Sequence, residues 1–169
     1  MGAEGQGASA IEQRWLMTAR SLSFIRCGDE LLLLKRGAHK RVFPNQYNGL
    51  GGFIERNEDP LSSAKREILE ESDLVVDNLR LVAIHHIDAS AQTGILLFVF
   101  VGELGQKQAL PETPEGVLEW VKVTDLSHYD LVEDLPLILP HYLEHQGAPL
   151  FAHVSYDAND QIQIRYARG

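Results

Sequence analysis

The sequence predicts an α/β fold, and three features of its pattern support this assignment. Two β-rich runs come first, at Leu16 to Cys27 and Glu30 to Arg36. A segment with helical spacing and a helix-start signal follows near Asp59, and further β-rich runs come after it. Strands therefore lie on both sides of a helix along the chain.

The predicted strands are separated by turn-forming residues. Gly28 and Asp29 suit a tight hairpin turn between the first two runs. A second helix should span Leu135 to His145, with a kink at Pro140. The later β-rich runs are Leu79 to Ile87, Ile95 to Val101, Val117 to Val123, and a closing hairpin of Phe151 to Tyr156 with Ile162 to Tyr166.

Capping residues predict where the first helix begins and ends. Asp59 can accept hydrogen bonds from free backbone N–H groups, and Pro60 loses none at the first helical position. The helix should run through Glu71 and end at Asp73, because aspartate tolerates a left-handed backbone better than most residues. The residues spaced to face the core are Leu61, Ala64 and Ile68.

Length and composition indicate one globular domain. We assign it to residues 11–169, after a Gly- and Ala-rich leader of residues 1–10 that we expect to be flexible. The net charge of -9 argues against stable partners among nucleic acids or acidic membranes. Cys27 is the only cysteine, and no signal-peptide pattern opens the chain, so we expect a cytoplasmic location.

Basic residues gather between Lys35 and Tyr47, where Gly37 and Pro44 favour a loop. Such a loop could clamp phosphate groups, and the alternative is a solvated charged loop. The four basic residues in this stretch are Lys35, Arg36, Lys40 and Arg41.

Three glutamates of the first helix share one face. Glu67, Glu70 and Glu71 stand at i, i+3 and i+4, where like charges ordinarily repel and weaken a helix. Mg²⁺ prefers carboxylate oxygens together with water and substrate phosphates, so this face could bind the metal. The alternative is an exposed acidic helix partly balanced by Lys65 and Arg66.

The segment from Gly52 to Leu74 resembles the Nudix box, G-x5-E-x7-R-E-U-x-E-E-x-G-U, in which U is aliphatic. The matching residues are Gly52, Glu58, Arg66, Glu67, Ile68, Glu70, Glu71 and Leu74. Asp73 departs from the pattern by standing in place of its second glycine. Because that glycine would serve the helix-ending turn, we expect activity to survive the change.

The resemblance to Nudix hydrolases implies a fold, a chemistry and a set of roles. The fold would be an α/β/α sandwich with a mixed central β-sheet, and the box would form a loop-helix-loop. The three box glutamates would bind Mg²⁺, with Mn²⁺ as a substitute, and Gly52 would contribute its backbone near the metal. Arg66 would help to hold the catalytic loop by pairing with an acid, for which we favour Glu58.

Many family members recruit another glutamate from outside the box. The run PETPEGVLEW offers three acids for this role, and we favour Glu115 among them as a metal ligand. Each could equally be a solvated loop acid. The three are Glu112, Glu115 and Glu119.

The phrases LLLLKRG and YNGLGG resemble the branch of the family that contains purine 8-oxo-dGTP diphosphatases. In that branch an Asn contacts the base, which maps onto Asn48 with Tyr47 beside it; the alternative for Asn48 is a turn residue. A late acidic pair can also help to read the purine, and Glu133 with Asp134 is the nearest counterpart. The spacing after the pair departs from the pattern, so helix capping is the favoured explanation of Asp134.

The predicted function is Mg²⁺-dependent hydrolysis of a small nucleotide, most simply 8-oxo-dGTP or another purine triphosphate, to the monophosphate and pyrophosphate. Alternatives are hydrolysis of ADP-ribose, a dinucleoside polyphosphate or another capped diphosphate, since the box does not specify the attached group. A noncatalytic nucleotide-sensing domain is a further alternative. His85 and His86 lack a third metal ligand, and we expect them to be partly exposed.

Overall fold

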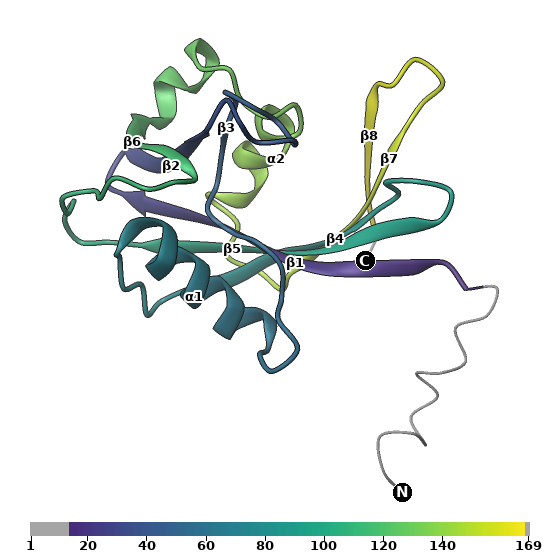
Figure 1. The fold of residues 1–169 in the computed structure, drawn as a ribbon, viewed down its shortest axis with the longest axis horizontal. Helices are drawn as coiled ribbons and strands as arrows, with labels where there is room; N and C mark the ends of the chain where they lie inside the picture. The colour runs from purple at the N-terminus through teal and green to yellow at the C-terminus, as the bar shows by residue number, and fades with distance from the viewer. Residues whose placement is uncertain (1–13, 168–169) are drawn as a thin grey trace, which may run out of the picture.

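A mixed β-sheet forms the centre of the computed structural model, which describes residues 14–167 (Figure 1). The strand order is β3-β2-β1-β5-β4-β7-β8, and β6 pairs with β2. The β1–β5 and β4–β7 pairs are parallel, whereas the other pairs are antiparallel. The elements are β1 Leu16–Cys27, β2 Glu30–Arg36, β3 Tyr47–Asn48, α1 Pro60–Ser72, β4 Arg80–Ile87, β5 Thr93–Glu103, β6 Gly116–Lys122, the 3₁₀ helix η2 Val123–His128, α2 Leu135–Tyr142, β7 Leu150–Tyr156 and β8 Ile162–Tyr166.

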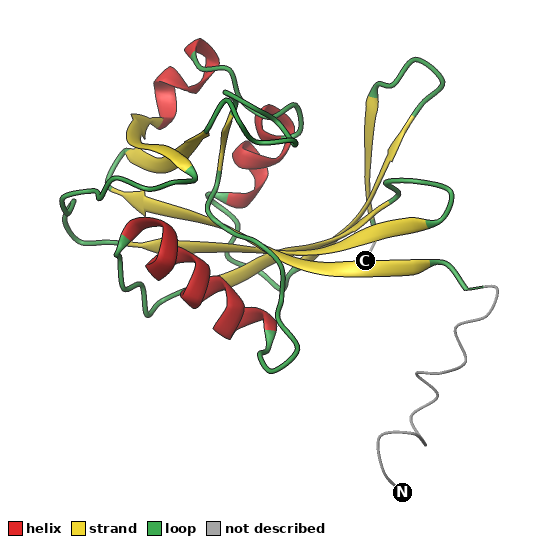
Figure 2. Ribbon diagram, viewed as in Figure 1, coloured by secondary structure: helices red, strands yellow, loops and turns green. Residues whose placement is uncertain are grey.

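The two helices α1 and α2 cover opposite faces of the sheet (Figure 2). Alternation along the strands separates two hydrophobic clusters, because successive side chains point to opposite faces. Phe24 and Leu33 pack with α2, whereas Ile25 and Leu34 pack with Ile68 of α1. The predicted α/β/α sandwich with a mixed central sheet is therefore confirmed.

Strands β1 and β2 diverge soon after their shared turn. They pair only over Ile25–Cys27 and Glu30–Leu32, and β1 then continues along β5. The segment after β3 fills part of the gap: Leu50 exchanges backbone hydrogen bonds with Ser23, and the Gly52 carbonyl accepts one from Ser21 at 2.9 Å. This divergence places the loop before α1 against the edge of β1.

Local capping sets the ends of α1 as predicted. The Asp59 side chain accepts hydrogen bonds from the backbone N–H groups of Leu61 and Ser62. Asp73 has a left-handed backbone with φ 56°, and its N–H donates to the Leu69 carbonyl at 2.9 Å. The expectation that Leu61 faces the core is wrong, because it lies in the first turn and is 41% exposed.

Several other expectations are corrected. α2 ends at Tyr142 rather than His145, with Pro140 inside its last turn. His85 is fully buried rather than partly exposed, because it lies on the face of β4 that packs against Tyr142.

The predicted leader, residues 1–10, lies outside the described residues. Within residues 14–167, no helix is long and apolar enough to cross a membrane.

Candidate active site

The three box glutamates lie on the part of α1 that faces the Gly-rich segment after β3. Glu71 is 7% exposed, and its Oε2 accepts a hydrogen bond from the Gly51 N–H at 3.0 Å. Glu67 is half-buried, and its carboxylate lies beside Gly52. Glu70 is the outermost, with 58% of its side chain exposed. The face therefore runs from a buried carboxylate to a solvated one.

Arg66 connects this face to the loop before the helix. Its Nε donates to Oε2 of Glu58 at 2.9 Å and its Nη2 to Oε1 at 2.6 Å, so the pair is bidentate. Nη2 also donates to the Phe53 carbonyl at 3.1 Å, and Nη1 contacts both Glu67 and Glu70. The hydrogen bonds from Arg66 and from the Glu55 N–H hold the pKa of Glu58 at about 2. One guanidinium thus ties the loop to the acidic face.

Two glycines allow the loop to approach α1 and β1 closely. A Cβ at Gly52 would overlap the carboxylate of Glu67, and one at Gly51 would overlap the backbone of Ser21. Gly51 also has a positive φ of 152°, which side chains rarely permit. Gly51 therefore requires glycine, whereas a side chain at Gly52 would displace the Glu67 carboxylate; the two glycines bring backbone atoms next to the acidic face.

Glu71 forms no ion pair within residues 14–167, and Glu67 shares its one cationic partner there, Arg66, with two other carboxylates. Burial, followed by the charges of Glu67 and Glu115, raises the pKa of Glu71 to about 8, even though the Gly51 N–H opposes the shift. Burial likewise raises the pKa of Glu67. A hard divalent cation would offset this concentration of negative charge, so the donor set fits Mg²⁺ or Mn²⁺.

The carboxylates are not already arranged as a ligand set. Over residues 14–167, no three His, Cys, Asp or Glu side chains have positions that could hold a metal ion together. The hydrogen bonds of the three glutamates explain this arrangement: Glu67 and Glu70 accept from Arg66, and Glu71 accepts from the Gly51 N–H. Binding a cation would require these side chains to rotate.

The acids outside the box differ in their surroundings. Glu115 pairs with Lys40, and its charge acts on Glu71. Glu119 instead accepts hydrogen bonds from the hydroxyls of Tyr47 at 2.9 Å and Tyr129 at 3.0 Å. Glu112 is exposed. Of the three, Glu115 is therefore the one whose charge reaches the box.

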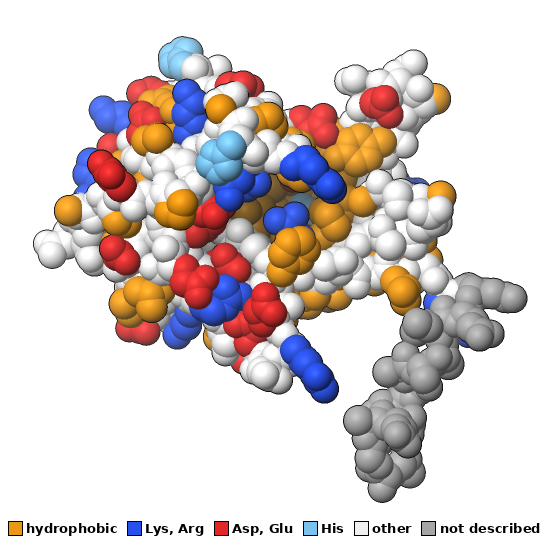
Figure 3. Space-filling model, in the orientation of Figure 1, with side chains coloured by type: hydrophobic (Ala, Val, Ile, Leu, Met, Phe, Trp, Pro, Cys, Tyr) orange, Lys and Arg blue, Asp and Glu red, His pale blue; other side chains and the backbone are white. Residues whose placement is uncertain are grey.

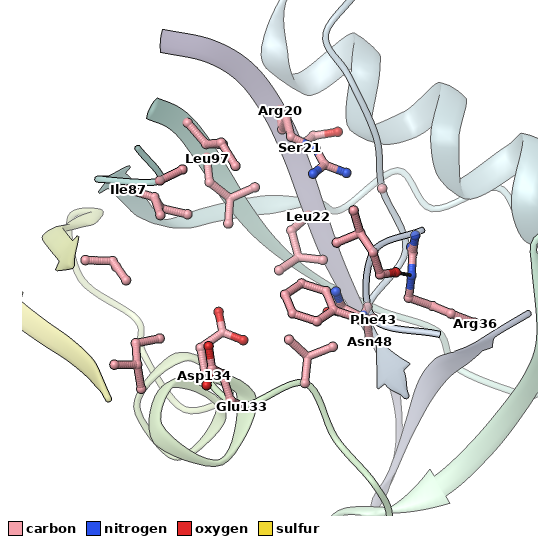
Figure 4. A pocket seen from close by; sticks show the side chains of 18 of the residues that line it. Arg20, Ser21, Leu22, Arg36, Phe43, Asn48, Ile87, Leu97, Glu133 and Asp134 are labelled. Carbon is pink, nitrogen blue, oxygen red and sulfur yellow. Dashed lines mark hydrogen bonds between the residues drawn. The ribbon is translucent and has the colours of Figure 1, made fainter. Parts of the chain in front are cut away.

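A cavity of about 400 Å³ adjoins the acidic face, with Gly51 in its wall. In Figure 3, acidic and basic side chains over α1 lie beside a hollow edged by hydrophobic side chains. Figure 4 shows Arg20 and Arg36 on one side of this pocket and Glu133 with Asp134 across it. The lining residues between the two sides are mainly apolar, including Leu22, Phe43, Ile87, Ile95, Leu97 and Val132.

Arg20 is a pocket residue that the sequence reasoning missed. Its guanidinium lies 4.8 Å from the centroid of the Phe53 ring, and its buried Nε has no hydrogen-bond partner in residues 14–167. Burial lowers the pKa of Arg20, and the nearby Arg36 lowers it further, while Glu67 opposes the change. The only available signal was an Arg in the middle of an apolar-rich strand that also contains Arg26. Two neighbouring guanidiniums, one with a free donor, form a basic end of the pocket.

Only some of the predicted base- and phosphate-binding residues lie in the pocket wall: Asn48 and Arg36 do, whereas Tyr47 and Lys35 do not. Asn48 lines the pocket, and its Oδ1 accepts a hydrogen bond from the Gly49 N–H at 2.8 Å, while its amide NH₂ has no hydrogen-bond partner within residues 14–167 and can donate to a ligand. Arg36 also lines the pocket, with its Nε bound to the Val42 carbonyl at 2.8 Å. Asn48 thus combines the turn contact with a position in the pocket wall.

The assignment of Tyr47 and Lys35 to the substrate site is corrected. These residues are cross-strand partners in β2 and β3, so they point away from the face that carries Arg36 and Asn48. The Lys35 ammonium lies 5.7 Å from the Tyr47 ring centroid, and neither residue lines the pocket. Of the other basic residues, Lys40 is paired with Glu115 and Arg41 is exposed.

Glu133 and Asp134 both line the pocket, where α2 begins. Helix capping does not explain Asp134, because its side chain makes no capping hydrogen bond. Burial raises its pKa, and the charge of Glu133 adds to the effect. The earlier preference for a capping role is therefore corrected, and the pair forms an acidic end of the pocket.

Comparison with known proteins links the chain to one family. The model of the NUDIX domain matches residues 17–142. A NAD-capped RNA hydrolase NudC from Pectobacterium atrosepticum is 39% identical over 59 residues, which are 35% of this chain and 22% of that protein. The chain therefore matches about a fifth of the length of this curated relative.

Solved structures share the fold at low sequence identity. The MutT protein from Bacillus halodurans has a TM-score of 0.73 and 23% identity, over 89% of this chain and 97% of that one. The NUDIX domain of Shewanella oneidensis NrtR, solved in complex with ADP ribose, has a TM-score of 0.61 and 17% identity, over 82% and 96%.

Proposed function

Because this chain belongs to the Nudix family, we propose that it is a Mg²⁺-dependent hydrolase of a purine nucleoside triphosphate such as 8-oxo-dGTP, with products nucleoside monophosphate and pyrophosphate. The observation that carries the proposal is the charge polarity of the pocket, which has a basic end and an acidic end. Its basic end, Arg20 and Arg36, adjoins the acidic face of α1, and its acidic end, Glu133 and Asp134, lies across an apolar middle.

This polarity fits the two ends of a nucleotide. Phosphate oxygens would bind the guanidiniums, where the unpartnered Nε of Arg20 offers a donor. A purine base would occupy the apolar middle, and the carboxylates would accept hydrogen bonds from its N–H groups. The free NH₂ of Asn48 would donate to a base acceptor. The substrate would therefore be oriented with its phosphates next to the box.

The box residues divide the remaining tasks. Glu67, Glu70 and Glu71 would hold the cation, with Glu115 as an additional acid and the Gly52 backbone nearby. When bound, the cation would neutralise phosphate charge and lower the pKa of a water molecule. The Arg66–Glu58 pair would fix the loop, so that Gly51 and Gly52 keep their positions against the acidic face.

In the reaction, the water oxygen attacks the α-phosphorus in line, and the bond to the bridging oxygen breaks. The bridging oxygen leaves with pyrophosphate, while a box glutamate accepts the proton of the water. Arg20 and Arg36 would stabilise the negative charge that develops on the phosphate oxygens.

A second candidate substrate is ADP-ribose, because the structurally similar NrtR domain was solved in complex with ADP ribose. The terminal ribose hydroxyls could donate to Glu133 and Asp134 in place of base N–H groups. A dinucleoside polyphosphate or another capped diphosphate would place a second nucleoside there. A noncatalytic sensing domain would bind these ligands without turnover.

A substrate panel tests the proposal. The protein would be assayed with Mg²⁺ on 8-oxo-dGTP, dGTP, dATP, dCTP, ADP-ribose and a dinucleoside tetraphosphate, with kcat/KM and the products measured for each. We expect the highest kcat/KM for a guanine-type triphosphate, with pyrophosphate as a product. Preference for ADP-ribose would replace the proposed substrate, and binding without turnover of any compound would replace the proposed hydrolase.

A further inference from the structure

The β7–β8 hairpin forms one wall of the pocket, although it lies beyond residue 142, where the family match ends. Three of its residues, Val154, Tyr156 and Ile162, line the cavity. β7 is attached to the sheet in parallel with β4, and Val154 is the register partner of Ile87, which also lines the cavity. The apolar wall therefore continues from the family domain onto the hairpin.

Along β7, the residues of this wall change from buried to exposed. Val154 is buried in the core, whereas Tyr156, two residues further along the same face, is 42% exposed. Its cross-strand partner is Ile162, which is half-buried. A partly exposed Tyr–Ile pair that faces a cavity is apolar surface still available to a ligand. In Figure 1 the hairpin rises from the sheet edge, apart from α1 and β6.

Tyr156 and Glu133 both line the cavity, so the hairpin meets the acidic end of the pocket at this pair of residues. Burial raises its pKa to about 12, and the adjacent carboxylate of Glu133 is the next cause. A phenol beside a carboxylate can donate to one of its oxygens and leave the other oxygen available. One side chain thus offers an aromatic ring to the apolar wall and a hydroxyl to the acidic end.

We propose that the β7–β8 hairpin is a substrate-specificity element, in which Tyr156 contacts the base with its ring and positions Glu133 toward the N–H edge of guanine with its hydroxyl. This inference rests on the proposed nucleotide function and adds to it a residue outside the matched domain. Guanine presents two neighbouring N–H donor groups, N1–H and the 2-amino group, which suit a held carboxylate; adenine lacks a donor at N1.

The test compares Tyr156→Ala and Tyr156→Phe with a matched control, Phe151→Ala. Phe151 lies on the same strand, is an aromatic residue exposed by 59%, and does not line the pocket. For each protein, kcat and KM would be measured with dGTP, dATP and the base-free 5-phosphoribosyl 1-diphosphate. The affinity for GMP would be measured by calorimetry, and the Tm would report folding.

We expect Tyr156→Ala to raise the KM for dGTP about tenfold to a hundredfold, with kcat and the Tm little changed, because the base loses an aromatic contact. Tyr156→Phe should keep most of the affinity and lower the preference for dGTP over dATP about tenfold, because only the hydroxyl is lost. Hydrolysis of the base-free compound and the properties of Phe151→Ala should match the wild type.

Two results would overturn the inference. One is an unchanged KM for dGTP and an unchanged GMP affinity in folded Tyr156→Ala. The other is an equal loss on all three compounds, which would indicate a purely structural role. The GMP measurement separates the proposed hydrolase function from the proposed role of Tyr156. If the wild type binds GMP without hydrolysing any compound, the hydrolase function is rejected. The role of Tyr156 is then decided by the GMP affinities of the wild type and the variants. Absence of both binding and turnover would reject both.

Discussion

Arg66 and Glu58 form a bidentate pair, with distances of 2.9 Å between Nε and Oε2 and 2.6 Å between Nη2 and Oε1. Arg66 reaches the Phe53 carbonyl and two box glutamates at the same time. The loop before α1 and the acidic face are therefore held by a single planar side chain. Its geometry, more than its charge, should matter for activity.

Replacing Arg66 by Lys tests this geometry. Lys keeps the positive charge but cannot contact both Glu58 oxygens and the carbonyl in one plane, so we expect kcat to fall about tenfold to a hundredfold. The free energy of unfolding should change little, because the pair is partly exposed. Steady-state kinetics and urea unfolding would measure both. Lys65→Met is the control, since Lys65 lies next to Arg66 in the helix and its one ion pair in the described part of the chain is with the exposed Asp77 at 3.7 Å. A wild-type kcat in Arg66→Lys would refute the anchoring role.

Replacing Asp73 by Gly tests the one departure from the box. Glycine adopts the left-handed backbone seen at φ 56° without a Cβ penalty, so the free energy of unfolding should stay similar or rise by up to about 1 kcal/mol. Activity should be retained. Thermal unfolding and kcat would be compared with the wild type. A large fall in kcat with unchanged folding would give Asp73 a chemical role instead.

Buried His85 predicts a pH dependence of stability. Burial lowers its pKa from 6.5 to about 4, so as the pH falls below 6.5 the unfolded chain takes up a proton that the folded chain does not. The free energy of unfolding should therefore decrease as the pH falls, by about 2 kcal/mol between pH 7 and pH 5, and the loss should be complete below about pH 4. Urea unfolding at a series of pH values would measure it.

A pair of variants isolates this contribution. His85→Gln removes the titrating group and should flatten the decrease between pH 7 and pH 5, although the loss of the Tyr142 contact lowers stability at every pH. His86→Gln changes the exposed neighbour on the same strand and should keep the wild-type slope. An equal slope in all three proteins would show that His85 does not cause the pH dependence.

Asn48→Ala tests base recognition. If the free amide donates to a purine, the variant should lose about tenfold to a hundredfold in preference for the purine over a pyrimidine triphosphate, because one buried polar contact is worth about 1–3 kcal/mol. The measurement is kcat/KM on both substrates with the same folded protein. Equal losses on both would show that Asn48 supports the turn at Gly49 rather than the base.

Features that depend on neighbouring residues could be predicted from the sequence. Asp59 and Pro60 mark the start of α1, and Asp73 marks its end, because capping acts within a few residues. The box is likewise contiguous, so its glutamates and their shared face follow from helical spacing alone. Strand ends such as Cys27 follow from the adjacent Gly–Asp turn.

Features that depend on distant segments could not be predicted. β3 has two residues, too few for a pattern to show that Tyr47 points away from the pocket while Asn48 lines it. Arg20 enters the site because β1 and β2 diverge and the loop after β3 packs between them. The contribution of the closing hairpin depends on the parallel pairing of β7 with β4, which no local signal specifies.

The central claim is that the acidic face of α1 supports Mg²⁺-dependent cleavage of a phosphoanhydride bond. Glu70→Gln tests it most directly, because Glu70 is the most exposed of the three box glutamates and its substitution removes an anionic oxygen without disturbing a core contact. Pyrophosphate release at saturating Mg²⁺ would be measured for the wild type and the folded variant. The account predicts a loss of at least about a hundredfold in kcat with an unchanged Tm, and near-normal turnover in the folded variant would contradict it.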